Sequence, residues 1–114
     1  MRENNLTTRA FYFAKDVISL MDSLQHKRST DILAKQIIRA SSSIGANIVE
    51  ARSSSTTKEY KRFVEISLKS SNECKYWLSL LINLHSTHKQ TLEKLLSENI
   101  ELSKMLSRSV LTLK

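Results

Sequence analysis

Residues 39–55 read RASSSIGANIVEARSSS, and they decide between a flexible loop and a helix with unusually small side chains. Apolar residues recur before and through this stretch at steps of three and four, at Leu33, Ile37, Ala40, Ile44 and Ile48. This is the period of one helical face, and the serines at 41–43 do not interrupt it. The only glycine, Gly45, costs a helix about 1 kcal/mol relative to alanine, which tertiary packing can offset. The stretch is therefore predicted to be helical to about residue 52, with a loop only at 52–56.

The same periodicity extends outward in both directions and predicts helices at about 7–25, 31–52, 57–85 and 88–112. Thr7 can cap the start of the first helix, Thr56 with Glu59 matches a capping box, and Thr87 with Gln90 matches a second one. The chain has no proline and one glycine, the residues on which turn-rich β folds depend. The expected fold is therefore all-α: an antiparallel up-down-up-down four-helix bundle, formed by residues 1–114 as a single domain. Because residues 57–85 are apolar on two sides, that helix is expected to pack against another subunit as well as the core.

The chain is basic, with a formal net charge of +7 and a pI near 9.8. This favours a partner with negative charge, nucleic acid above all, although a basic but inert surface is the alternative. The candidate contact residues are Arg52, Lys58, Lys61, Arg62 and Lys69. On a helix, Lys58, Arg62 and Lys69 can share one side, and Lys61 lies off that line. Without an aromatic stacking platform or a helix-turn-helix, we expect contact with the backbone and weak sequence preference.

A line of polar residues follows one side of the 31–52 helix, at steps of four, four and three: Arg39, Ser43, Asn47 and Glu50. Two interpretations compete. In the structural one, Asn47 and Glu50 are partly buried and fix the register between helices or subunits through hydrogen bonds. In the functional one, the line forms a polar site. The structural interpretation is favoured because no nucleophile or base is arranged around the line.

The sequence has no signature of catalysis, cofactor binding or metal binding. One glycine cannot form a phosphate-binding loop. All three histidines fall in predicted breaks, and His85 and His88 have no nearby Cys, Asp or Glu to complete a metal site. Cys74 lies on an apolar helix face, where a buried thiol is expected rather than a nucleophile. We therefore expect a protein that is not an enzyme.

The sequence also bears on the compartment. A single cysteine excludes an intramolecular disulfide, which fits a reducing cytoplasm. The first residues lack the apolar run of a signal peptide, and the longest apolar stretch, 76–84, is too short to span a bilayer. The expectation is a soluble cytoplasmic protein with no membrane partner.

Several of these residues fall into a known pattern. The string Q-I-I-R-A at 36–40 is followed by Ser43–Ile44, A-N-I at 46–48 and Glu50, and then by Phe63, Ile66, Ser70 and Glu73. Together they resemble the four-helix-bundle family encoded in intervening sequences of bacterial 23S rRNA genes. That family is in turn similar to the accessory protein of diversity-generating retroelements, which works with a reverse transcriptase. On this resemblance, Glu73 joins the polar line as a candidate interface residue.

The chain departs from the family pattern at two positions. Ala51 stands where the family usually has a glycine after the glutamate of its second helix, which would lengthen that helix. Lys69 stands where a glycine often precedes the serine of the third helix, which places a cation where close packing would be expected.

The resemblance implies a ring-shaped homopentamer and a binding role with RNA, DNA or an RNA-associated protein. The first hypothesis is therefore an oligomeric, nucleic-acid-associated protein whose ring multiplies the charge of each chain. The second is an adaptor or scaffold for a reverse transcriptase or ribosome-associated factor, in which the basic face binds an acidic protein.

Overall fold

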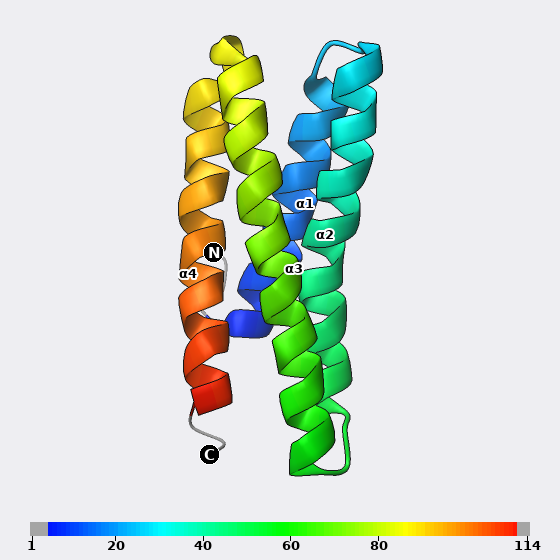
Figure 1. The fold of residues 1–114 in the computed structure, drawn as a ribbon, viewed down its shortest axis with the longest axis vertical. Helices are drawn as coiled ribbons and strands as arrows, with labels where there is room; N and C mark the ends of the chain where they lie inside the picture. The colour runs from blue at the N-terminus through cyan, green and yellow to red at the C-terminus, as the bar shows by residue number, and fades with distance from the viewer. Residues whose placement is uncertain (1–4, 112–114) are drawn as a thin grey trace.

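All four predicted helices are present in the computed structural model, which describes residues 5–111. They are α1 (Leu6–Ser23), α2 (Arg28–Arg52), α3 (Thr57–Leu84) and α4 (Lys89–Leu111), with a short 3₁₀ turn, η1 (Ser86–His88), before α4. Successive helices run antiparallel and lie side by side, and α4 also contacts α1, which closes an elongated bundle of 44 × 28 × 20 Å (Figure 1). The predicted all-α, up-down-up-down bundle is confirmed.

The serine-rich stretch is helical up to Arg52, where α2 ends, and the loop follows at 53–56, as the periodicity predicts. Ala40, Ser41, Ile44 and Ile48 are buried, so the small and large residues of the stretch share one inward face. Small side chains also bring α1 close to α2. A Cβ atom added at Gly45 would lie 3.7 Å from the Cβ of Ala10, which is ordinary van der Waals contact.

Hydroxyl groups connect α3 to its neighbours through the core. The buried Ser67 donates from Oγ to the backbone oxygen of Ile44, at 2.8 Å. On the other side, the buried Ser71 donates from Oγ to Oδ1 of Asn99, and Asn99 Nδ2 donates to the backbone oxygen of Ser71, both at 2.9 Å. These bonds satisfy polar groups that would otherwise be costly to bury. The apolar core around them comes from all four helices.

The ends of α1 and α2 differ from the sequence prediction by up to three residues. α1 is capped by Asn5 rather than Thr7, because Asn5 Oδ1 accepts the backbone N–H of Thr8 at 2.9 Å. It ends at Ser23, and α2 begins at Arg28 rather than 31, because Lys27 is its N-cap. The predicted break at 25–30 is therefore shorter and lies closer to the N-terminus.

The predicted N-terminal cap of α3 is confirmed, whereas the predicted cap of α4 is wrong. The side chain of Thr56 caps α3 as predicted, accepting the N–H of Glu59 at 3.1 Å. Thr87 does not cap α4. It lies inside η1, where the N–H of His88 donates to the backbone oxygen of His85 at 3.2 Å. The chain therefore enters α4 through a tighter turn than a capping box would make.

Helix lengths set the shape of one end of the molecule. α1 has 18 residues, whereas α2 and α3 have 25 and 28. The loop joining α2 to α3 consequently lies beyond the N-terminal end of α1 and the C-terminal end of α4, and the α2–α3 hairpin projects there (Figure 1). We call residues 52–62 of this hairpin the tip.

Candidate functional site

The predicted contact residues lie at the tip and on the helix that leads away from it. Arg52 ends α2, Lys58, Lys61 and Arg62 lie in the first two turns of α3, and Lys69 lies further along. All are exposed except Lys61, which is half-buried. The guanidinium of Arg62 lies over the ring of its neighbour Phe63, 5.3 Å from the centroid, which holds its charge close to the helix surface. The line of Lys58, Arg62 and Lys69 is about 16 Å long at 1.5 Å per helical residue.

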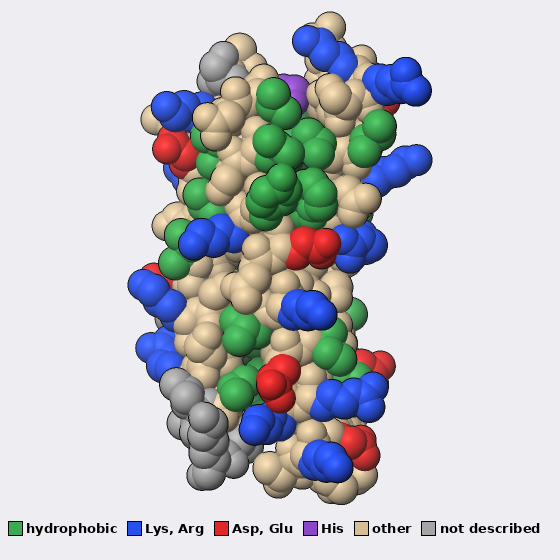
Figure 2. Space-filling view, in the orientation of Figure 1, with side chains coloured by type: hydrophobic (Ala, Val, Ile, Leu, Met, Phe, Trp, Pro, Cys, Tyr) green, Lys and Arg blue, Asp and Glu red, His purple; other side chains and the backbone are tan. Residues whose placement is uncertain are grey.

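The tip combines cations with hydroxyl groups. Five consecutive hydroxyl residues, at 53–57, separate Arg52 from Lys58. Ser55 and Thr57 are exposed there, beside the N-terminal end of α3, whose dipole favours negative charge. Between residues 52 and 62, the four cations outnumber the single carboxylate, Glu59. Lys and Arg side chains interspersed with a few carboxylates are visible on the lower half of the face in Figure 2. Such a combination of groups suits contact with phosphates.

The first half of the polar line connects α2 to α3. Arg39 Nη2 donates to Oε1 of Glu73 at 2.6 Å and to Oε1 of Gln36 at 3.1 Å. The side chains of Arg39 and Glu73 are 56% and 37% exposed, and ion pairs this exposed contribute about 0–1 kcal/mol. This pair therefore orients the two helices more than it stabilises them.

The second half of the line turns inward and then out to solvent. Ser70 Oγ donates to Oγ of Ser43 at 2.9 Å, across the α2–α3 contact. Asn47 Nδ2 donates to the backbone oxygen of Ser43 at 2.8 Å, one turn back along α2. Glu50 is exposed. Hence the structure places Ser43 and Asn47 in contacts within one chain and leaves Glu50 on the surface.

His85 and Cys74 carry side chains of the types most used in catalysis, but their surroundings in the fold give them structural roles. His85 Nε2 lies 3.2 Å from Thr30 Oγ1, but Thr30 is only 3% exposed, so its hydroxyl is covered. Burial raises the pKa of the Cys74 thiol to about 12, and the adjacent Glu73 carboxylate acts in the same direction. Throughout residues 5–111, no three His, Cys, Asp or Glu side chains come together as a metal site would require.

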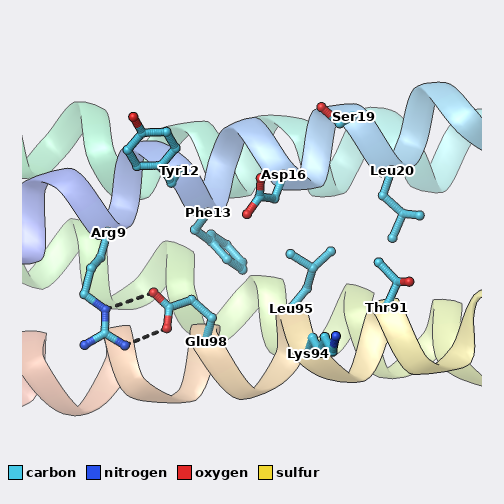
Figure 3. A pocket seen from close by; sticks show the side chains of 10 residues that line it. All are labelled: Arg9, Tyr12, Phe13, Asp16, Ser19, Leu20, Thr91, Lys94, Leu95 and Glu98. Atoms are coloured by element: carbon cyan, nitrogen blue, oxygen red, sulfur yellow. Dashed lines mark hydrogen bonds and ion pairs between the residues drawn. The ribbon is translucent and has the colours of Figure 1, made fainter. Parts of the chain in front are cut away.

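A cleft between α1 and α4 is the feature that the sequence did not reveal. It encloses about 700 Å³, and its floor is apolar, formed by Phe13, Leu20 and Leu95 (Figure 3). At one end, Arg9 donates from Nε to Oε2 of Glu98 at 3.0 Å and from Nη2 to Oε1 at 2.6 Å. The hydrogen bond to Glu98 raises the pKa of Arg9 further above its usual value. The two residues are 89 positions apart, so no local pattern pairs them.

The contact between Arg9 and Glu98 at the end of this cleft has a structural role, since it closes the bundle. The two-pronged Arg9–Glu98 bond ties α1 to α4, the pair of α-helices with the least extensive contact in the bundle. The volume is in the range of small-molecule pockets. Around its apolar floor lie charges of both signs, including Asp16 and Lys94.

Comparison with known proteins fits this architecture. The model of the 23S rRNA-intervening sequence protein family matches residues 2–108. This chain belongs to that family. A crystal structure of a protein with unknown function from the S23 ribosomal protein family of Bacteroides thetaiotaomicron is similar, with 29% sequence identity and a TM-score of 0.85. The match covers 93% of this chain and 98% of that one. No curated protein matches the chain.

Membership in the 23S rRNA-intervening sequence protein family confirms the resemblance carried by residues 36–73. It describes a fold more closely than an activity, since the structural relative itself has unknown function. Within the described part of the chain, no helix has the length and apolar character needed to cross a bilayer. What this family member binds must therefore be argued from its surface.

Proposed function

We propose that this protein is a non-enzymatic oligomer that binds the phosphate backbone of RNA or DNA through the tip of its α2–α3 hairpin. One observation carries the proposal: the exposed cations Arg52, Lys58 and Arg62 and a run of hydroxyl residues gather on a projecting end. Arg and Lys neutralise phosphates, and Ser and Thr donate to phosphate oxygens. None of these groups reads base edges from a recognition helix, so sequence preference should be weak.

Assembly strengthens such a site. A single tip offers only a few cations, and each phosphate contact on duplex DNA adds only about 0.9 to the salt slope of binding. In a ring with rotational symmetry the bundles point the same way, so every tip lies on one rim. Binding at several tips then becomes effectively intramolecular, which raises affinity without any new contact. The family resemblance implies five copies.

Salt dependence tests the proposal. RNA and duplex DNA binding would be measured against salt for the parent and for a variant with Arg52, Lys58 and Arg62 changed to Gln. If all three contact duplex phosphates, the slope of log affinity against log salt falls by about 2.7 per bound copy. The matched control changes Lys35, Lys75 and Lys104 to Gln, which removes the same charge elsewhere.

The results of these experiments distinguish nucleic-acid binding from the adaptor role. Absence of binding by micromolar parent protein at low salt would overturn the proposal, and so would an equal loss of slope in the control variant. An acidic protein could bind the same cations, which is the adaptor role. Partners captured from native lysate that survive nuclease would support that role instead of nucleic-acid binding.

A further inference from the structure

The cleft between α1 and α4 has a carboxylate in one wall and an ammonium group in the other. Asp16 of α1 is half-buried, and its carboxyl group points toward α4 (Figure 3). Lys94 is exposed on α4 and lies level with Asp16 on the opposite wall (Figure 3). Arg9 and Glu98 bind each other at one end of the cleft. The charged groups along the rest of its length are therefore Asp16 and Lys94.

An apolar floor lies between these two walls. Phe13, Leu20 and Leu95 form it, and each is at least nine-tenths buried in the core behind it. The volume of about 700 Å³ lies in the range of small-molecule sites, which combine an apolar lining with a few polar groups that fix the orientation of the ligand. A flat ring lying on this floor would bring one of its edges between the carboxylate and the ammonium group.

The chemistry of the two groups selects the edge that fits. A carboxylate accepts two neighbouring N–H groups at once, and an ammonium group donates to a carbonyl oxygen. Among the four bases of RNA, guanine has this order of groups on its Watson–Crick edge, since its N2 amino group and N1–H lie side by side and O6 follows. Adenine and cytosine present one amino group next to a ring nitrogen that accepts, and uracil presents one N–H between two carbonyl groups. A carboxylate therefore pairs completely with guanine only.

We propose that the α1–α4 cleft binds guanine, with Asp16 accepting from N1–H and the N2 amino group and Lys94 donating to O6. The apolar floor covers the ring. The base comes either from a free nucleotide or from an unpaired guanine in RNA, because both present the same edge. No residue of the tip lines the cleft. The site therefore adds recognition of a base to the proposed function and does not depend on phosphate binding at the tip.

Guanosine is the probe that tests the site, because this nucleoside has no phosphate to bind the basic surface. Calorimetric titration of the full chain measures its affinity, with adenosine and inosine as controls. Inosine keeps N1–H and O6 but lacks the N2 amino group, so it should bind more weakly than guanosine, and adenosine more weakly still. In NMR spectra, guanosine should shift the backbone amide signals around Asp16 and Lys94. No binding of millimolar guanosine, or equal binding of adenosine, would overturn the proposal.

Asp16→Asn changes the recognition without changing the size of the side chain. Its amide nitrogen replaces one accepting oxygen and opposes the N2 amino group, so guanosine affinity should fall by about 5- to 150-fold, the range for a good two-bond contact to a base. Xanthosine carries an oxygen in place of that amino group and should bind this variant better than guanosine does. Asp22→Asn is the matched control, since it removes the same charge from an exposed position of α1 outside the cleft.

The change of preference separates recognition from misfolding. A variant that only loses stability loses guanosine without gaining xanthosine, and this result would assign Asp16 a structural role and refute the edge contact. Unchanged guanosine affinity in Asp16→Asn would refute it as well. The variant with Arg52, Lys58 and Arg62 changed to Gln should keep its guanosine affinity, and a loss there would place the base at the tip instead.

A last comparison distinguishes the two sources of the base. A short oligouridylate with one central guanine is titrated beside the same oligonucleotide with adenine at that position. If the change to adenine weakens binding by the factor found between the nucleosides, the cleft accepts guanine within an RNA strand. If the two oligonucleotides bind equally while guanosine still binds, the ligand is the free nucleoside or nucleotide.

Discussion

Replacing Gly45 with alanine should stabilise the subunit, although Gly45 lies where α1 and α2 approach each other. Its φ is not positive, so alanine can adopt the same backbone conformation. The added Cβ would lie 3.7 Å from the Cβ and 3.8 Å from the carbonyl carbon of Ala10, distances at which neither atom has to move. What remains is the helix propensity, which favours alanine by about 1 kcal/mol in a helix interior. A gain of this size should raise the melting temperature by about 4 °C.

Urea denaturation followed by circular dichroism measures this gain. The experiment should be run at two protein concentrations, because association adds to apparent stability and Gly45 also lines an open groove between α1 and α2. Ala46→Gly is the matched control: it is the adjacent, exposed position of the same helix and should lose about 1 kcal/mol. If Gly45→Ala lowers the free energy of unfolding by 1 kcal/mol or more while the control behaves as expected, the helices lie closer than the structure places them.

Four further predictions concern the core and one helix cap. Asn99→Ala removes two buried hydrogen bonds to Ser71 and leaves a cavity, so it should cost about 2–4 kcal/mol of unfolding free energy; a cost under about 1 kcal/mol would contradict the importance of these bonds. Burial raises the pKa of Cys74 to about 12, so the thiol should resist alkylation at pH 8 until urea is added, and rapid labelling of the native protein would refute this. The pKa of the Cys74 thiol is higher in the folded protein than in the unfolded chain. Its contribution to the free energy of unfolding is therefore complete below about pH 9 and is lost between about pH 9 and 12. Over that range, the difference in unfolding free energy between the parent and Cys74→Ala should narrow. Thr56→Ala removes the oxygen that caps α3 and should cost about 1 kcal/mol, whereas Thr57→Ala should cost little, and equal losses would argue against the cap.

Local sequence was sufficient to predict the helices. Whether residues 41–46 form a helix depends on side chains three and four positions away, which can be read directly from the sequence. The cap of α3 is equally local, since Thr56 bonds to a residue three positions on. The cap of α1 shows the limit: Asn5 and Thr7 are both good N-caps, and the choice between them depends on where α1 must start to cover the core.

The candidate site was predictable only as a set of charges. The sequence identifies Arg52, Lys58 and Arg62 as neighbours along the chain, but the projecting hairpin depends on how far α1 and α4 extend beside it. The ion pair of Arg9 with Glu98 joins residues 89 positions apart, and either residue has several partners of equal chemistry in the sequence. The choice among them is made by the rotation of each helix about its axis.

The sequence by itself determined four helices, their order and a basic chain, because helix formation and net charge depend on composition and on neighbours within one turn. Only the tertiary structure decided which small residues line the groove between α1 and α2, which large apolar residues stay exposed and which charges are paired. Those features arise between helices, where packing of the whole core sets the distance and rotation of each element.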